Sequence, residues 1–461
     1  MTSSTTEHPF GSDHPFARAV DALRAVVRIP TISYRDDERI DAAAFERLLT
    51  ELAERFPRAH ALDVTRIEPH ALLVRWAGET DADPIVLMAH LDVVPVDGDA
   101  PWTRPPFGGD LADAPEGLCV WGRGTLDDKG SAVAILTAVE TLLESGYTPA
   151  RDVWLSFGCN EEVSGDAAPR AVATLRERGV TPWFVLDEGG AIASGAFPGV
   201  TAPIGVVGVA EKGSTMIELV ARGGGGHGST PAANGPAVRI ANAVAALDRL
   251  SLPRRVPAPT RELLARLAPH LGGPLHPLVG RIVRAESLVA SVLARAGAET
   301  RAIVQTTLAF TTLSAADGMN VIPTTAKAGV NARILPGDTV ADIVARIRRA
   351  IDDGVEIDVV EAAEPSAVSP YSTAEVTDPA FALLESVIGE IFPDAVPSPY
   401  VMMAATDSRH FTEICARVYR FSPFRMSREQ RATIHSVDER ITVDTLLEGV
   451  GWYRSLLQRL G

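Results

Sequence analysis

The sequence predicts an α/β protein in which a mostly parallel sheet with flanking helices carries an inserted α+β domain of ferredoxin-like order. Strand-like and helix-like segments alternate through the first part of the chain, as they do where helices connect parallel strands. The segment Ile85–Ala89 is continuously apolar, which is typical of a strand covered on both faces. The chain of 461 residues is also too long for one ordinary domain.

Apolar residues recur with the period of a helix or a strand in each segment of the first part. The first helix stops at Ile29-Pro30, because the residue before a proline is disfavoured in helices. The expected helices are residues 16–27, 41–55, 130–143 and 168–178, and the expected strands are residues 71–76, 84–89, 153–158 and 183–186.

Beyond residue 213 the order changes to strand, helix, strand, strand, helix, strand, which is a ferredoxin-like order. We expect residues 213–363 to be an inserted domain, within a first domain made of residues 1–212 and 364–461. The expected strands are residues 215–221, 303–311, 325–334 and 355–360, and the expected helices are residues 237–250, 340–351, 378–391 and 443–460. A Pro-, Arg- and Leu-rich stretch, residues 252–300, is expected to be helical.

Composition limits the partners of this chain. The net charge is −16, which disfavours nucleic acids and anionic membranes as partners. The motifs described below favour a small-molecule substrate instead. Residues 1–15 lack the basic and apolar regions of a signal peptide, and no apolar stretch reaches the length of about 20 residues that spans a membrane. Cys119, Cys159 and Cys415 form no disulfide framework, so we expect a cytoplasmic protein.

Clusters of acidic residues and histidines follow strand-like segments or glycine turns, where open α/β sheets place their sites. Each cluster alone also fits a solvated turn, a helix cap or a structural histidine. Together they supply the nitrogen and oxygen ligands of two divalent metal ions, which suits zinc and allows manganese or cobalt. The clusters are His90-Leu91-Asp92, Asp127-Asp128, Glu161-Glu162, Asp187-Glu188 and His435.

Longer motifs occur in order between residue 16 and the C-terminus: Ala89-His90-Leu91-Asp92, Gly122–Gly130, Asn160-Glu161-Glu162, Gly226–Pro231, Asn320–Pro323, Arg333–Gly337 and His435. In these motifs the chain resembles the dinuclear zinc amidohydrolases and peptidases that include aminoacylase, carboxypeptidase S, glutamate carboxypeptidase and succinyl-diaminopimelate desuccinylase. Residues 185–190 and 406–411 look most like the carboxypeptidase S branch, which includes N-acyl-amino-acid hydrolases.

The resemblance implies a set of metal ligands. One metal ion would be bound by His90 and the other by His435, and Asp127 would bridge the two ions. Glu162 would complete one site and Glu188 the other.

The remaining acids of these clusters receive other roles by resemblance. Asp187 is the reserve candidate for the ligand Glu188, because members of the family differ over which acid of this segment binds metal. Asp92 would orient the imidazole of His90 through its second ring nitrogen. Glu161 would be the general base and acid, and the peptide bond between Asp127 and Asp128 is expected to be cis.

The inserted domain is expected to act as a lid or dimerisation domain that supplies substrate contacts. By resemblance, His227 would stabilise the oxyanion, reaching into a partner subunit in dimeric relatives, so a homodimer is one expected state. Asn320 and Arg333 would hold the substrate, with Arg333 paired to its carboxylate. Asn331 departs from the Asp that many relatives carry ahead of this arginine, which puts the surroundings of Arg333 in doubt.

The expected activity is the hydrolysis of an amide bond next to an amino acid with a free carboxylate, as in a carboxypeptidase or an N-acyl-amino-acid amidohydrolase. A di- or tripeptidase, or a deacylase of acetylated or succinylated metabolites, is the alternative with the same metal site. A catalytically inactive binding protein is disfavoured, because Glu161 stands beside an intact ligand set. Residues 252–300 could cover an acyl chain, pack within the lid or form a dimer surface.

Overall fold

The computed structural model describes residues 17–197, 199–271 and 286–461. The chain forms two compact units: unit 1 runs to Val209 and includes Ser369–Pro399 and Thr406–Gly461, and unit 2 comprises Ala210–Val368 and Tyr400–Ala405. The polar segment 1–15, the first residue of the helix expected at 16–27, and residues 272–285 of the stretch 252–300 lie outside the described residues.

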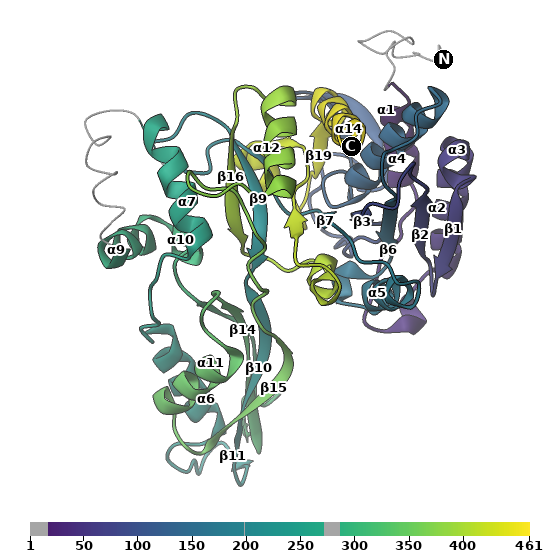
Figure 1. Ribbon diagram of the computed structural model, residues 1–461. Coiled ribbons are helices and arrows are strands. Elements are labelled where there is room, and N and C mark those ends of the chain that lie inside the picture. The colour runs from purple at the N-terminus through teal and green to yellow at the C-terminus, as the bar shows by residue number, and fades with distance from the viewer. Residues whose placement is uncertain (1–16, 198, 272–285) are drawn as a thin grey trace. The chain divides into compact units, whose positions relative to one another are not determined.

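Unit 1 is built on a large sheet, which has ten strands in the described part of the chain (Figure 1). Its central strands β6, β3, β7 and β17 are parallel, and antiparallel strands flank them on both sides. The α/β class with a mainly parallel sheet is therefore confirmed. The strand order is β1 (Asp63–Ile67), β2 (Ala71–Trp76), β6 (Val153–Gly158), β3 (Ile85–His90), β7 (Phe184–Asp187), β17 (Val418–Arg420), β9 (Ile204–Glu211), β8 (Ala191–Ala193) and β18 (Arg425–Met426), with β16 (Val396–Met402) beside β9.

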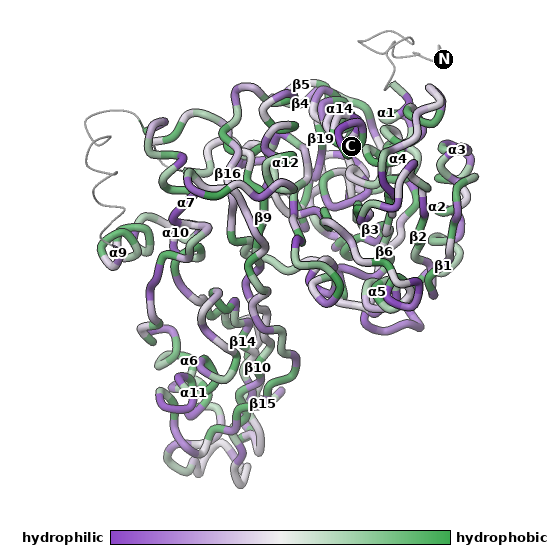
Figure 2. Tube along the Cα trace, viewed as in Figure 1, coloured by the Kyte–Doolittle hydropathy of each residue, from purple (hydrophilic) through white to green (hydrophobic). Residues whose placement is uncertain are grey.

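Alternate side chains of β3 enter two different apolar cores. Ile85, Leu87 and Ala89 belong to one core, and Val86 and Met88 belong to the other. Because helices cover both faces, every residue of β3 is buried, which explains its continuously apolar sequence (Figure 2). The first core includes residues of α1 (Ala17–Val27), α2 (Ala42–Arg55), α4 (Lys129–Glu144), α12 (Pro379–Ile391) and α14 (Val443–Gln458), and the second includes residues of α5 (Ala167–Glu177).

A small antiparallel sheet in unit 1 joins two distant parts of the sequence. It consists of β4 (Asp110–Ala114), β5 (Gly117–Trp121) and β19 (Arg440–Thr442). In the pairing of β5 with β19, Trp121 lies opposite Arg440. The residues that follow β5 therefore run beside the residues that precede β19.

Unit 2 contains a four-stranded antiparallel sheet with the order β12-β14-β10-β15. Along the chain its elements are β10 (Gly213–Arg222), α6 (Pro236–Asp248), β12 (Thr307–Ser314), β14 (Thr325–Ile334), α11 (Val340–Ala350) and β15 (Val355–Ala363), which is the ferredoxin-like order. Side chains of α6 and α11 pack with one face of this sheet in a separate apolar core.

The stretch between α6 and β12 is helical where the structure describes it. The strand expected at 303–311 begins only at Thr307, because residues 298–302 form a last helical turn. The helices of this stretch are α7 (Ala258–Leu267), the 3₁₀ turn Ala268–His270, α9 (Glu286–Ala296) and α10 (Ala298–Ala302).

Two further features bear on the expectations from composition. Cys119, Cys159 and Cys415 are buried and unpaired. Within residues 17–197, 199–271 and 286–461, no helix combines the length and the hydropathy that crossing a bilayer requires.

Candidate metal centre

Strand β3 presents His90 at its carboxyl end, against a group of acidic side chains. The imidazole is 3% exposed, and its Nε2 lies 2.9 Å from Oδ1 of Asp127 and 3.8 Å from Oε1 of Glu188. Its Nδ1 lies 3.0 Å from the backbone carbonyl oxygen of Asp92. An imidazole that donates a hydrogen bond through Nδ1 keeps Nε2 available for a metal ion.

A second imidazole, that of His435, lies on the other side of Asp127. Its Nε2 is 2.9 Å from Oδ2 of Asp127 and 3.0 Å from Oε2 of Glu162. These two contacts raise the pKa of His435 to about 10 in the metal-free protein. The two oxygens of Asp127 thus face two different imidazoles, as a carboxylate that bridges two metal ions must do.

The described residues contain two groups of three side chains whose ligand atoms all lie within 4.8 Å of one another: His90 with Asp128 and Glu188, and His90 with Asp127 and Glu162. Asp128 was not among the predicted ligands. The peptide bond between Asp127 and Asp128 is cis, as expected.

The donor set fits divalent cations. Oδ1 of Asp128 and Oε1 of Glu162 are buried and have no hydrogen-bond partner among the described residues. Burial raises the pKa of Asp128 and of Glu188 well above the ordinary carboxyl value, and the neighbouring carboxylate of Asp127 raises both further. Bound cations would offset this buried negative charge.

Asp187 and Glu188 point to different partners at the end of β7. Oδ2 of Asp187 accepts a hydrogen bond of 2.9 Å from the backbone N–H of Ser408. Glu188 lies beside His90 and belongs to a ligand group, whereas Asp187 belongs to neither of the two groups above. The geometry therefore brings Glu188, rather than the reserve candidate, to the predicted site.

Asp92 contacts His90 and also holds the loop that carries Glu161 and Glu162. It is fully buried and accepts hydrogen bonds of 3.2 Å from the backbone N–H groups of both Glu161 and Glu162. The hydroxyl of Ser33 donates a further hydrogen bond of 2.6 Å to the same carboxylate. The role of Ser33 was not predicted, since it depends on a contact across 59 residues of sequence.

Glu161 begins the 3₁₀ turn Glu161–Val163 and takes part in neither ligand group. Burial raises the pKa of Glu161 well above its ordinary value, and the neighbouring carboxylates of Asp407 and Glu162 raise it further. Asp407 is another buried acid that sequence reasoning left without a role. Burial raises its pKa to about 7, with contributions from Asp187 and Asp92. The stretch 406–411 contains Asp407, but only the tertiary packing shows that its side chain is buried beside Asp187 and Asp92.

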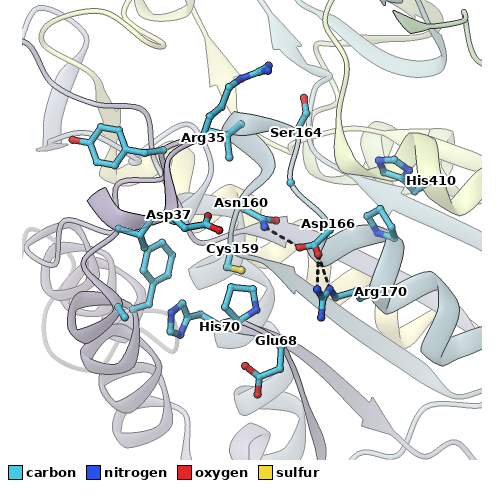
Figure 3. Close-up of a pocket in the computed structure, with 18 residues that line it drawn as sticks. Arg35, Asp37, Glu68, His70, Cys159, Asn160, Ser164, Asp166, Arg170 and His410 are labelled. Carbon is cyan, nitrogen blue, oxygen red and sulfur yellow. Dashed lines mark hydrogen bonds and ion pairs between the residues drawn. The ribbon is translucent and has the colours of Figure 1, made fainter. Parts of the chain in front are cut away.

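A cavity of about 910 Å³ adjoins the loop of Glu161 and Glu162 (Figure 3). Asn160 and Val163, on either side of the two glutamates, line it, but the two glutamates do not. Its wall combines apolar side chains with paired charges such as Arg170, which lies 2.6 Å from Asp166. One side of this loop thus faces the acidic cluster, and the other faces a cavity of mixed polarity.

In unit 2, the structure brings His227 and Asn320 together. His227 ends the two-residue strand β11 (Gly226–His227), which pairs with β13 (Val321–Ile322), and the N–H of Gly228 donates to the carbonyl oxygen of Asn320 at 2.8 Å. His227 is exposed, and its Nδ1 lies 2.7 Å from the hydroxyl of Ser229.

Arg333 lies on β14, on the face of the unit 2 sheet opposite the helices. Its neighbours Ala332 and Ile334 belong to the apolar core with α6 and α11, so Arg333 and Asn331 point the other way. In the register of the sheet, Arg333 pairs with Ser214 of β10. Oδ1 of Asn331 is buried without a hydrogen-bond partner among the described residues.

Known proteins show similarity along the whole chain. The profile of Peptidase family M20/M25/M40 matches residues 86–459. The chain is 32% identical over 466 residues to the N-fatty-acyl-amino acid synthase/hydrolase PM20D1.1 of Danio rerio, which covers 99% of this chain and 88% of that protein. It is 33% identical to the probable carboxypeptidase S-like 2 of Dictyostelium discoideum, over 95% of this chain and 84% of the relative.

The fold is also found among solved structures. The M20 family metallo-carboxypeptidase Sso-CP2 from Sulfolobus solfataricus superposes with a TM-score of 0.70 at 15% identity. The match covers 95% of this chain and 98% of the other. At this identity the likeness supports the fold alone.

Proposed function

The chain belongs to peptidase family M20/M25/M40, and on that basis we propose that it hydrolyses an amide bond next to an amino acid with a free carboxylate. The observation that carries the proposal is Asp127, whose two oxygens each lie 2.9 Å from a different imidazole. Relatives named as an N-fatty-acyl-amino acid synthase/hydrolase and a probable carboxypeptidase support N-acyl amino acids and C-terminal peptide bonds as substrates.

The proposed centre holds two divalent cations, with zinc as the first choice and manganese or cobalt as substitutes. His90 and Glu188 would hold one ion, His435 and Glu162 the other, and Asp127 both. Bound there, the ions would lower the pKa of a water molecule and polarise the amide carbonyl.

Glu161 is the proposed general base and acid. It would take a proton from the attacking water and pass it to the leaving amine. Its burial beside other carboxylates raises its pKa, which favours a side chain that holds a proton between the two steps. Asp92 keeps this residue in place through the backbone N–H groups of the loop.

The proposed substrate contacts come from unit 2. Arg333 would pair with the free carboxylate of the substrate in a two-pronged contact, and Asn320 would add a polar contact. His227 would stabilise the oxyanion of the tetrahedral intermediate. Backbone contacts between the short strands β11 and β13 hold His227 beside Asn320, while both side chains stay exposed and accessible to substrate.

Unit 2 is proposed to act as a lid and as the surface of a homodimer. Its sheet ends at β12, whose outer edge pairs with no strand in the described part of the chain. Leu313 on this strand is 65% exposed, and an apolar groove lies between β12 and α6. Such an edge is suited to pairing with a second copy. Three unpaired cysteines favour a cytoplasmic location.

A panel of N-acyl amino acids and dipeptides tests the proposed activity. Protein treated with a chelator should lose activity and regain it when zinc, manganese or cobalt is added. Substrates whose carboxylate is amidated should be poor. Activity that survives the complete removal of metal would rule out this function, and so would a preference for amidated substrates.

A further inference from the structure

One buried ion pair connects the two loops that carry Asp127 and His435. Nη1 of Arg123 lies 2.6 Å from Oε2 of Glu439, and the two side chains are 4% and 0% exposed. The partners are 316 residues apart in sequence. No predicted metal ligand is part of the pair, yet each partner stands four residues from one.

Glu439 holds the backbone of the loop that ends in Asp127. Its Oε1 accepts hydrogen bonds from the backbone N–H groups of Gly124, Leu126 and Asp127, at 3.0, 2.9 and 3.2 Å. Three donors that converge on one charged oxygen fix the path of the backbone. The position of the Asp127 carboxylate therefore depends on Glu439.

Arg123 holds the second loop with the same guanidinium group. Its Nη2 donates a hydrogen bond of 2.9 Å to the backbone carbonyl oxygen of Ser436, the residue after His435. His435 itself has a left-handed backbone with φ of 59°, which a non-glycine residue adopts only when its surroundings hold it there. The contact to Ser436 is one of the interactions that hold this turn.

The small sheet explains why these loops meet. Trp121, the last residue of β5, pairs with Arg440, the first residue of β19. The pairing continues by one hydrogen bond of 2.9 Å from the N–H of Gly122 to the carbonyl oxygen of Glu439. The loop after β5 and the loop before β19 therefore start at the same end of this strand pair. The Arg123–Glu439 ion pair connects the two loops there through side chains.

We propose that Arg123 and Glu439 are positioning residues that set the placement of Asp127 relative to His435. Arg123 would thereby set the affinity for the metal ion held by Asp127, Glu162 and His435, and Glu439, through Asp127, the affinity for both ions. The inference rests on the proposed function, because it concerns the same metal centre. Partners that orient metal ligands typically change metal affinity or activity by about 10–100-fold when they are substituted.

Two substitutions separate the two halves of this connection. In Arg123→Lys, a single ammonium group replaces the planar guanidinium group and cannot donate to both Glu439 and Ser436. Glu439 keeps its three backbone donors in this variant. This variant should weaken only the ion bound by His435, by about 10–100-fold. Glu439→Gln weakens the hold on Asp127, which contacts both imidazoles, so both ions should bind at least about tenfold more weakly.

The experiment is a titration of the metal-free full-length protein with cobalt(II), followed by the visible absorption of bound cobalt and by metal analysis after dialysis. Thermal unfolding of each metal-free variant is measured in parallel. Asp378→Asn is the matched control, because Asp378 is also a buried carboxylate that accepts two backbone N–H groups and pairs with an arginine. It should lower the melting temperature but leave both cobalt affinities unchanged.

Wild-type affinities for both ions in Arg123→Lys and in Glu439→Gln would overturn the proposal, whatever their melting temperatures. Equal losses in Asp378→Asn would also overturn it, because general destabilisation would then explain the result. If Glu439→Gln does not fold, Arg123→Lys alone decides through its selective effect on one ion. Wild-type protein that binds two ions but cleaves no acyl amino acid or peptide would contradict the proposed function, while these affinities would still decide the positioning role.

Discussion

The predicted functional histidines of the two units differ in how the structure holds them. His90 in unit 1 is 3% exposed and contacts Asp92 two positions away and two acids from distant segments, Asp127 after β5 and Glu188 after β7. His227 in unit 2 is exposed, ends a strand of two residues, and bonds through Nδ1 to Ser229 two positions away. The candidate metal centre is therefore formed by buried side chains from several segments, whereas the proposed substrate contact His227 lies exposed on a two-residue strand that pairs with β13.

This difference agrees with a division of chemical tasks. Groups that stabilise developing charge act best when they do not have to reorganise, and burial with fixed hydrogen bonds provides that. Residues that meet substrates of varying shape are commonly found on exposed loops and hairpins. The contrast leads to four predictions, of which the first concerns the buried centre and the next two concern unit 2.

The largest effect is expected for Glu161→Ala. Loss of a general base and acid should lower kcat by about 10²–10⁴-fold, while metal analysis still finds two ions per chain. Glu177→Ala, at an exposed position of α5, is the control and should behave as wild type. Activity within tenfold of wild type in Glu161→Ala would show that another group moves the proton.

His227→Ala should reduce kcat by about 10²–10³-fold, the usual effect of removing one oxyanion donor. Ser229→Ala, which removes only the local partner of Nδ1, should change kcat little. If His227 serves a partner subunit, mixing the inactive variants His227→Ala and Glu161→Ala should restore activity. About half of the dimers would then contain one chain of each variant, and one of the two sites in each such dimer would be intact, so activity should reach about a quarter of wild type. No recovery after subunit exchange would place His227 in the same chain as the Glu161 it assists.

Arg333→Lys should lower kcat/KM for substrates with a free carboxylate by about 10–100-fold, because lysine retains the charge but not the two-pronged contact. The variant and the wild type should be equally poor with amidated substrates. Lys327→Ala on the same strand, where Lys327 pairs with Glu218 on the surface, is the control for charge alone. A similar loss on both kinds of substrate would assign Arg333 a structural role.

The smallest effect concerns stability against pH in metal-free protein. Burial raises the pKa of Asp407 to about 7, above its ordinary value of about 3.9. Below pH 4 the folded and unfolded states both hold the proton. Between about pH 4 and 7 the unfolded state releases the proton while the folded state keeps it, so the folded protein loses stability as the pH rises. Asp407→Asn should therefore gain several degrees in melting temperature relative to wild type between about pH 4 and 7.

Thermal unfolding at several pH values measures this difference. The advantage of Asp407→Asn should be smallest at pH 4 and should shrink when metal is bound, since cations favour the ionised carboxylate. An advantage that does not depend on pH would mean that packing, rather than ionisation, explains it.

Most long periodic segments could be predicted from the sequence, whereas β9 and β16 of the large sheet and several short elements were missed. Strands β3, β6 and β14 and helices α2, α4 and α12 lie within a residue or two of the expected ranges, since burial on one or two faces imposes a regular apolar pattern. The strands of the small sheet were missed, because β4 and β19 are short and largely half-exposed and show no such pattern. That sheet nevertheless brings the loops of Asp127 and His435 together.

The candidate site divides in the same way. Residue chemistry indicates which side chains can bind metal: imidazoles and carboxylates after strands are suitable ligands in any fold. Chemistry does not distinguish Asp187 from Glu188, because both carry the same group on adjacent positions. The backbone N–H of Ser408 donates a hydrogen bond to Asp187, whereas Glu188 lies beside His90, so the packing of three segments favours Glu188 as the proposed ligand.

The amino-acid sequence thus predicts the α/β class, most of the long periodic elements and the candidate ligands, because apolar periodicity and side-chain chemistry are local properties. The folded chain adds the contacts across hundreds of residues: Arg123 with Glu439, Ser33 with Asp92, and the inclusion of Asp128 beside His90. These depend on strand pairing and on which buried polar groups find partners, and no short stretch of sequence contains that information.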